Sequence, residues 1–343
     1  MASQDLPGRG IVAVHAHPDD ETLTHGGTLA LWARAGQPVT IVTCTRGEQG
    51  EVIPADLRHL EGDGGRLAAV REQELSNAVA ALGVPHQVFL DQIPIEDADT
   101  HPRYEDSGMV WVGEGKAGAV DAAPSSFVAA GIEHAATRLA AVIREQQPKF
   151  VLTYEPGGGY GHPDHIRARE VAVHAAEIAA GHRDIPGYSA EPWRVPAVLG
   201  SVMLEEVLRD ARMEVRDHWT TQFAHIARHH EVNPDNPDGD LPSLARGVND
   251  RNGLITVDLA IASVLEARTK AMESHATQIR DVYQLPDAVE QAQQYPYLTG
   301  GYALSNNIYA PAVGRDYFLP DPEWDPHPRS VASVDLTPVE NQR

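Results

Sequence analysis

The chain has 343 residues, of which 42% are hydrophobic, so it can bury a core in one large domain or in two ordinary ones. Its formal net charge is −22, and a surface this acidic repels phosphate backbones, so we expect no nucleic-acid partner. There is no apolar run of about 18 residues and no signal-like N-terminus, and the single cysteine excludes an internal disulfide, so we expect a cytoplasmic protein without a membrane span.

Predicted strands and helices alternate through the first half of the chain. Short apolar strands are expected at 10–17, 38–45, 86–91 and 149–156. Each is followed by a segment with helical periodicity, at 21–37, 62–83, 126–147 and 162–180. This order predicts an α/β fold of the Rossmann-like type, a mostly parallel sheet with helices on both faces. Ligands bind such sheets beyond the carboxyl ends of the strands.

The second half is less regular. We expect a strand at 197–203 and a helix at 259–279, and we interpret residues 92–124 as a loop. The expected organisation is a catalytic core at 8–195, a smaller C-terminal α/β portion at 196–319 that walls the active-site crevice, and an extended tail at 320–343.

Two polar clusters follow predicted strands. "VHAHPDDETLTHGG" (14–27) follows the first strand and "YEPGGGYGHPDH" (154–165) follows the fourth, so both lie at the expected crevice. Two imidazoles and one carboxylate suit a catalytic zinc that keeps one position for water, and a second carboxylate could take a proton from that water. Spacing alone does not decide whether Asp19 or Asp20 is the ligand. Either cluster alone is more simply explained by helix capping; together they predict a metal site.

Neither glycine-rich stretch has the spacing of a dinucleotide-binding or phosphate-binding loop, so we do not expect a nucleotide cofactor.

"AHPDDE" (16–21) and "GHPDH" (161–165) together resemble the motifs of the LmbE/PIG-L family of zinc-dependent N-deacetylases, which remove acetyl groups from N-acetylglucosaminyl substrates. The similarity runs through most of residues 10–280. Further stretches resemble the actinobacterial branch of mycothiol metabolism: "TCTRGEQGEV" (43–52), "REQEL" (71–75), "DSGM" (106–109) and "HATQI" (275–279).

This resemblance implies that His17, Asp20 and His165 bind one zinc ion per subunit, with Fe²⁺ as the alternative metal. It implies that Asp19 is the general base and later returns the proton to the leaving amine. Asp164 would orient its neighbours.

Two further residues would face the reacting carbonyl, His162 as an acid or electrostatic stabiliser and Tyr160 as a partner of the oxyanion. Arg71 and Asp106 would hold the hydroxyl groups of a small amidosugar substrate, with Met109 packing nearby. The sequence makes no prediction about the oligomeric state.

The implied reaction is removal of the acetyl group from N-acetylglucosaminyl-inositol. A related amidase that cleaves mycothiol S-conjugates is the first alternative; its motif tends to carry a lysine where this chain has Thr24, which favours the deacetylase. A deacetylase of another N-acyl glucosamine is the second alternative. A non-catalytic sugar-binding protein is the third, and it would have no use for Asp19 beside a metal ligand.

Overall fold

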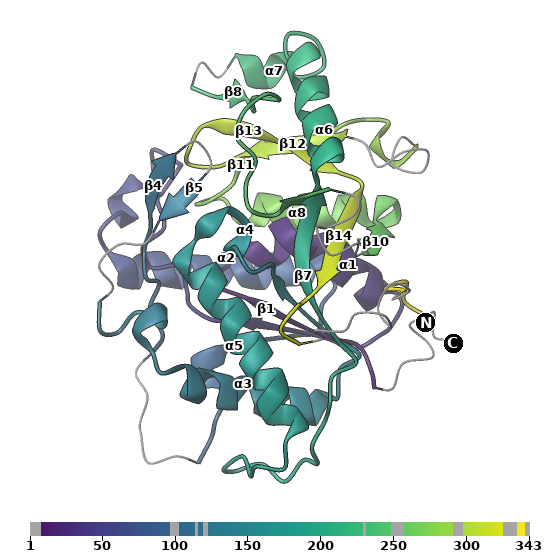
Figure 1. Ribbon diagram of the computed structural model, residues 1–343. Coiled ribbons are helices and arrows are strands. Elements are labelled where there is room, and N and C mark those ends of the chain that lie inside the picture. Colours follow the sequence, from purple (N-terminus) through teal and green to yellow (C-terminus); the bar gives the residue numbers. More distant parts are fainter. Residues whose placement is uncertain are drawn as a thin grey trace.

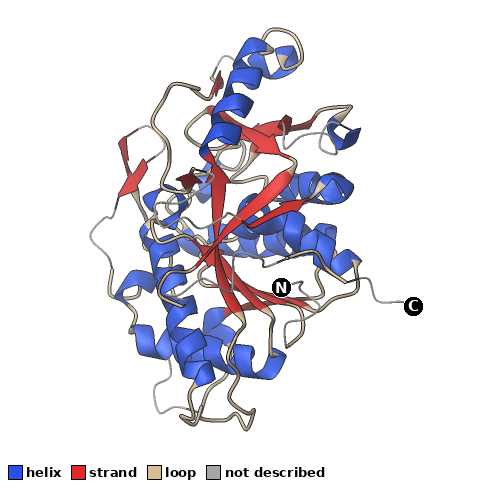
Figure 2. Cartoon of the chain, turned by 45° about the vertical axis from the view of Figure 1, so that its right-hand side comes forward, coloured by secondary structure: helices blue, strands red, loops and turns tan. Residues whose placement is uncertain are grey.

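The computed structural model of the chain describes residues 8–96, 103–113, 116–118, 123–228, 231–247, 257–290, 298–324 and 335–339. An eight-stranded sheet passes through these residues, in the order β10-β14-β7-β6-β1-β2-β3, with β9 paired to the end of β7. Its strands are β1 (Ile11–His15), β2 (Val39–Thr43), β3 (His86–Phe89), β6 (Phe150–Tyr154), β7 (Ala197–Leu204), β9 (Ala245–Arg246), β10 (Val257–Ala260) and β14 (Arg315–Pro320). Figure 2 shows the sheet as a twisted layer with helices on both sides, which confirms the predicted fold class.

The central strands are parallel, and the chain changes direction across the sheet between β1 and β6. β1 pairs with β2 on one side and with β6 on the other, where Ile11 lies opposite Phe150. The strands predicted at 10–17 and 149–156 are therefore neighbours, as expected for the two sides of a ligand-binding crevice.

Two layers of helices cover the sheet. One consists of α1 (Asp20–Arg34), α2 (Gly64–Leu82) and α8 (Leu265–Ser274), and the other of α3 (Ile132–Gln146) and α5 (Pro163–Ala180), which lie side by side in Figure 1. Side chains of a strand alternate between faces, so Ile11 and Ala13 pack into the first core whereas Val12 and Val14 pack into the second.

The smaller portion is a second, four-stranded sheet with the order β11-β12-β13-β8. Its strands are β11 (Arg280–Gln284), β12 (Leu298–Ala303), β13 (Ile308–Val313) and β8 (Asn233–Pro234), next to helices α6 (Glu205–Asp217) and α7 (Ala224–Ala227) in Figure 1. A hairpin of β4 (Val110–Gly113) and β5 (Lys116–Gly118) projects beside the main sheet, and α4 (Gly158–Gly161) is a single turn before α5. Short 3₁₀ turns lie at Arg58–Leu60, Leu90–Gln92, Phe127–Ala129 and Ala262–Val264.

Two predicted elements differ from the structure. The helix predicted at 259–279 is wrong at both ends: residues 257–260 alternate between buried and exposed positions and form strand β10 against β14, and α8 ends at Ser274. The loop predicted at 92–124 contains the hairpin β4–β5, although residues 97–102, 114–115 and 119–122 lie outside the described part of the chain.

The later strands tie the expected C-terminal portion to the core. β7, β10 and β14 all follow residue 195, yet they belong to the main sheet. The expected tail begins where β14 ends, at Pro320, and Leu336 within it is buried, with its carbonyl accepting a hydrogen bond from Trp32 Nε1 at 2.8 Å. Residues 325–334 and 340–343 of that tail lie outside the described residues. Among the helices of the described ranges, none has the length and hydrophobicity needed to cross a membrane.

A buried ion pair anchors the residues after β14 to helix α5. Arg169 donates from Nε and Nη2 to the two carboxylate oxygens of Asp321, at 2.7 Å each, and Asp321 is only 2% exposed. Asp321→Ala would leave the guanidinium buried without this partner, so we expect the free energy of unfolding to fall by about 3 kcal/mol in urea denaturation.

Glu323→Ala is the matched control, because Glu323 contacts the same Arg169 at 2.9 Å through a side chain that is 66% exposed. We expect a loss of less than about 0.5 kcal/mol for this variant. Equal losses in the two variants would contradict the anchoring role of Asp321.

Candidate metal centre

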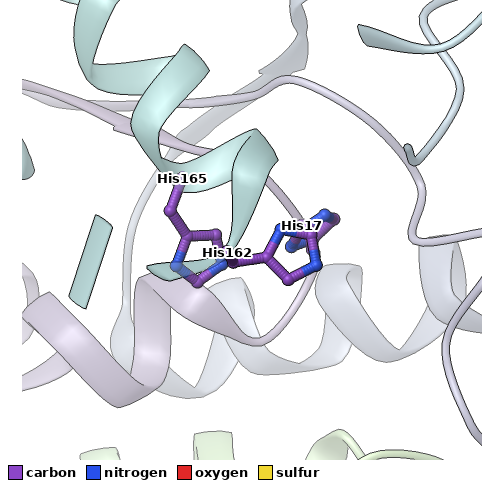
Figure 3. Close-up of side chains that lie close together, drawn as sticks. All are labelled: His17, His162 and His165. Carbon is purple, nitrogen blue, oxygen red and sulfur yellow. The ribbon is translucent and has the colours of Figure 1, made fainter. Parts of the chain in front are cut away.

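The two polar clusters predicted from the sequence meet at the carboxyl ends of β1 and β6. The first cluster forms the turn between β1 and α1, and the second forms α4 and the first turn of α5. Pro163 occupies the first position of α5, where a proline costs no hydrogen bond and its fixed φ favours the helix. Figure 3 shows the imidazoles of His17, His162 and His165 gathered beside this turn.

His165 presents one free ring nitrogen to the site. Its Nδ1 lies 3.1 Å from the carbonyl oxygen of Gly158, to which it donates, and its ring stacks on Tyr154 with a centroid distance of 4.2 Å. Its Nε2 is buried, has no hydrogen-bond partner among the residues that the structure describes, and lies 3.3 Å from Oδ1 of Asp20. A buried ring nitrogen left open beside a carboxylate is the state required of a metal ligand.

His17 has a carboxylate on each side of its ring. Nδ1 lies 3.3 Å from Oδ2 of Asp20, and Nε2 lies 3.2 Å from Oδ2 of Asp164. Asp164 is fully buried and also accepts hydrogen bonds from the backbone N–H of Ser107 at 2.8 Å and from its hydroxyl at 2.5 Å. A histidine that binds a metal through one nitrogen usually donates from the other to a carboxylate, and Asp164 is placed to receive that bond.

Asp20 lies between Nδ1 of His17 and Nε2 of His165. Burial favours its neutral acid, but His165 and His17 hold the pKa of Asp20 well below its usual range, so it is ionised. One oxygen of Asp20 lies 3.3 Å from the ring of His17 and the other lies 3.3 Å from the ring of His165. The side chains of these three residues are of the types that bind a metal through imidazole and carboxylate.

His162 is close to this group but uses one ring nitrogen elsewhere. Nδ1 accepts a hydrogen bond from the backbone N–H of Asp164 at 3.1 Å, which caps helix α5. Burial and the neighbouring rings of His17 and His165 lower the pKa of His162 to about 2, so the ring is neutral. The proton of the neutral ring then lies on Nε2, which makes this nitrogen a hydrogen-bond donor.

The described residues also contain two other possible donor groups. His17, His162 and His165 have nitrogens within 4.8 Å of one another, and so have ligand atoms of His17, Asp106 and Asp164. The cap bond of His162 and the Ser107 bonds of Asp164 compete with metal binding in these groups.

Asp19 adopts a backbone conformation that is rare for its residue type, with φ 107° and ψ −34°. Its carboxylate oxygen Oδ2 accepts a hydrogen bond from Nη2 of Arg71 at 3.1 Å. Burial raises the pKa of Asp19 to about 6, partly opposed by Arg71 and reinforced by Asp20.

A cavity of about 340 Å³ opens over the donor group. Its lining includes eight of the residues singled out in the sequence: His17, Asp19, Asp20, Arg71, Asp106, Met109, Tyr160 and His162. The other two, Asp164 and His165, lie beneath the lining and contact it through His17 and Asp20. The structure therefore brings all of the predicted site residues together in one place.

Arg71 and Asp106 are largely occupied by other parts of the chain. Arg71 is 3% exposed and donates to the carbonyl oxygens of Gly47 and Pro18, at 2.8 and 2.5 Å. A side chain at Gly47, which has a φ of 69°, would meet this guanidinium, so glycine is required there. Asp106 accepts from the backbone N–H of Gly108 at 2.8 Å, and its Oδ1 lies 3.6 Å from His17 Nε2.

Thr24, on which the sequence-based choice of substrate depended, does not line the cavity; the neighbouring Leu23 does. The hydroxyl of Thr24 donates to the carbonyl oxygen of Asp20 at 2.5 Å and lies 3.1 Å from Nδ1 of His25. Any effect of Thr24 on substrate choice would therefore be indirect, through the position of helix α1 and its neighbouring residue Leu23.

Sequence reasoning missed several residues that shape the site. Glu155 is 2% exposed and accepts hydrogen bonds from the backbone N–H groups of Gly157 and Gly159, at 2.7 and 3.0 Å, so it fixes the glycine-rich turn. Arg246 and Ser243, from the second half of the chain, hold the same carboxylate. Glu155 stands inside the quoted "YEPGGGYGHPDH", but no spacing rule identifies its two glycine partners.

The doubly wound sheet with a buried imidazole–carboxylate group beyond its carboxyl ends is the architecture of an α/β enzyme with a candidate metal centre. Residues 12–176 match the family described as "PIG-L: GlcNAc-PI de-N-acetylase". The chain belongs to this family, which confirms the predicted resemblance.

Relatives named 1D-myo-inositol 2-acetamido-2-deoxy-alpha-D-glucopyranoside deacetylase match most of the chain. The protein from Kineococcus radiotolerans is 42% identical over 80% of this chain and 70% of its own length. The protein from Streptomyces avermitilis is 38% identical over 92% of both chains, and that from a Nocardioides species is 36% identical over 90% of both.

Solved structures with a related chain path are more distant. A deacetylase in complex with teicoplanin is 17% identical, with a TM-score of 0.47, over 91% of this chain and 98% of its own. The N,N'-diacetylchitobiose deacetylase of Pyrococcus horikoshii is 18% identical, with a TM-score of 0.46, over 84% of this chain and 74% of its own. Similarity at this level carries no argument about the reaction.

The hydrogen bonds at the site predict different metal affinities for two variants. Asp20→Asn removes the charge of the carboxylate between the rings of His17 and His165, so we expect the affinity for a divalent metal to fall by about 100-fold. His162→Asn keeps a residue that caps helices well and should change the affinity by less than about 10-fold.

Equilibrium dialysis with elemental analysis measures both affinities. A larger loss in His162→Asn than in Asp20→Asn would place the metal on the three imidazoles instead.

Proposed function

We propose that the chain hydrolyses the N-acetyl amide of 1D-myo-inositol 2-acetamido-2-deoxy-α-D-glucopyranoside, releasing acetate and the free amine, as a step of mycothiol biosynthesis. The proposal depends on the similarity to named deacetylases together with the buried donor group at the cavity. The chain covers 70 to 92% of the length of the three deacetylases described above, and the buried group of His17, Asp20 and His165 lies at its cavity, with the carboxylate of Asp19 beside it.

The proposed metal ligands are His17, Asp20 and His165, and the proposed ion is zinc, one per subunit. The open Nε2 of His165 and the ionised carboxylate of Asp20 support this set. Fe²⁺ uses the same kinds of ligand, so availability would decide between the two metals. When bound, a divalent ion there would polarise a water molecule and the acyl carbonyl.

Asp19 is the proposed general base. It lines the cavity directly beside the ligand Asp20, and Arg71 holds its Oδ2. In this role it takes a proton from the attacking water, whose oxygen forms a bond to the acyl carbon. The same carboxyl group then gives the proton to the amide nitrogen as the C–N bond breaks, so that acetate and a primary amine leave.

Tyr160 and His162 are the proposed partners of the oxygen that becomes negatively charged. Both line the cavity, and Nε2 of His162 is a donor because Nδ1 accepts from the backbone of Asp164. This hydrogen bond supports an electrostatic role for His162 over proton transfer. Asp164 is proposed to fix the orientation of His17 through its bond to Nε2.

The sugar is proposed to contact the rest of the cavity wall. Asp106 and Met109 belong to one side of it, and Arg71 lies between the loops that carry Pro18 and Gly47. Cleavage of a mycothiol S-conjugate, or deacetylation of another N-acyl glucosamine, remain the alternatives to be tested. A sugar-binding protein without activity is disfavoured by Asp19, because binding alone needs no second carboxylate beside the proposed ligand Asp20.

The substrate is tested by incubating the metal-loaded protein with the N-acetylglucosaminyl-inositol and, separately, with a mycothiol S-conjugate, and measuring free amine. We expect kcat/KM for the acetyl substrate to exceed that for the conjugate by at least about tenfold. The relatives described above are named for the acetyl substrate, and a site shaped for one acyl group discriminates against a different one.

The Asp19→Asn protein serves as the control for contaminating amidases. Preference for the conjugate would make the protein an amidase. If neither substrate yields amine while metal is bound, the substrate assignment is wrong.

The role of Asp19 is tested by Asp19→Asn, which keeps an oxygen for Arg71 but removes the base. We expect kcat to fall by about 10²- to 10⁴-fold, whereas the metal content stays that of the unmodified protein. Turnover at the normal rate with metal in place would remove Asp19 from the mechanism.

A further inference from the structure

The backbone of Asp19 must be held in place by its surroundings. Its φ of 107° lies in a region that residues with a side chain rarely adopt, and it lies between Pro18 and the first residue of α1. Such a conformation persists only where neighbouring groups hold it. Arg71 binds the side chain of Asp19, but a bond to the carboxylate does not fix φ.

Glu21 supplies a contact to that backbone. Its Oε2 accepts a hydrogen bond from the N–H of Asp19 at 3.0 Å. Its Oε1 accepts from the hydroxyl of Thr22 at 2.6 Å and lies 2.7 Å from Nε2 of His275. Glu21 is fully buried and does not line the cavity, so its carboxylate acts on the protein and not on the substrate.

His275 holds Glu21 from the other end of the chain, 254 residues away in sequence. It is also fully buried, and within the described part of the chain its Nδ1 has no hydrogen-bond partner, so the ring donates to Glu21 from Nε2. The segment that carries it is fixed separately by Glu74, which accepts from the N–H and the hydroxyl of Thr277 at 2.8 and 2.7 Å.

We propose that Glu21, oriented by His275, is a positioning residue that holds the backbone of Asp19 so that its carboxylate points into the cavity. The inference rests on the proposed role of Asp19 as the base. It adds that a residue of the C-terminal portion, His275, acts on the base through the carboxylate of Glu21. Glu21 acts through Asp19, and it touches neither substrate nor metal.

Three variants separate positioning from a general structural role. Glu21→Leu removes the bonds to Asp19, Thr22 and His275 at similar volume. Glu21→Gln keeps an oxygen for the N–H of Asp19 and turns an amide toward His275, whose neutral ring then accepts through Nε2 and carries its proton on Nδ1. Glu74→Leu is the matched control, since Glu74 is another buried carboxylate that binds the segment of His275 but has no hydrogen bond to Asp19.

We expect Glu21→Leu to lower kcat by about 30- to 100-fold, because a small misplacement of a catalytic group has effects of this size. KM should stay within about threefold, and the metal content should be unchanged. We expect Glu21→Gln to keep kcat within about fivefold, and Glu74→Leu within about threefold even if its thermal stability falls as much as that of Glu21→Leu.

The second measurement repeats Glu21→Leu in the Asp19→Asn protein. If Glu21 acts through Asp19, the added substitution lowers the residual kcat by less than about threefold. A full further loss in that background would overturn the proposal. So would a loss of kcat that matches the loss of folded protein or of metal, or one that is equal in the Glu21 and Glu74 variants.

Failure of the proposed function can be distinguished from failure of the positioning role of Glu21, because in the first case the unmodified protein would release no amine from the acetyl substrate. In that case crystal structures of the unmodified protein and of Glu21→Leu decide the positioning claim. Movement of Asp19 to a negative φ in the variant supports it, and an unchanged Asp19 overturns it.

Discussion

The parallel pairing of β1 with β6 is the constraint on which the site depends. It brings His17 and Asp164, which are 147 residues apart in sequence, to a distance of 3.2 Å. Both strands are buried along their whole length, so packing on both faces fixes the register. A slip of one residue would move one loop by about 3.3 Å relative to the other and turn every side chain of β6 to the opposite face. The donor group would not survive such a shift.

This register concentrates buried carboxylates, and the chain compensates most of their cost with backbone donors. Asp164 is held by Ser107, Asp106 by the backbone of Gly108 and Gln49, and Glu155 by its glycine turn. Buried charges without partners are expensive, so these bonds are what permits the cluster to exist. Asp20 is ionised and lies between two ring nitrogens, so a cation bound there would stabilise its buried negative charge. This supports the proposed position of the metal.

The meeting of the candidate site residues was largely predictable from the sequence, because they lie in short motifs at the ends of strands. The strands before "AHPDDE" and "GHPDH" could be read from their apolar runs, and their meeting followed from the rule for doubly wound sheets. Contacts between distant segments could not be predicted. The bond between Glu21 and His275 spans 254 residues, and the nitrogen that His162 offers depends on a cap bond. The strand at 257–260 was not predicted, because the alternation of only four residues is a weaker signal than the helical periodicity of the segment that follows.

Both the part of the chain that matches the family and the part that follows it contribute residues to the cavity lining. All of the residues proposed for the reaction lie within residues 12–176, the part that matches the family. Gln278, Leu304 and Ser305 also line the cavity, and they lie outside that part. Since Arg71 is occupied by Pro18 and Gly47, less of the substrate recognition can rest on it than its motif implies. We therefore attribute the proposed reaction to the strand-end motifs, and we expect the choice among amides to depend on the wall to which Gln278, Leu304 and Ser305 contribute.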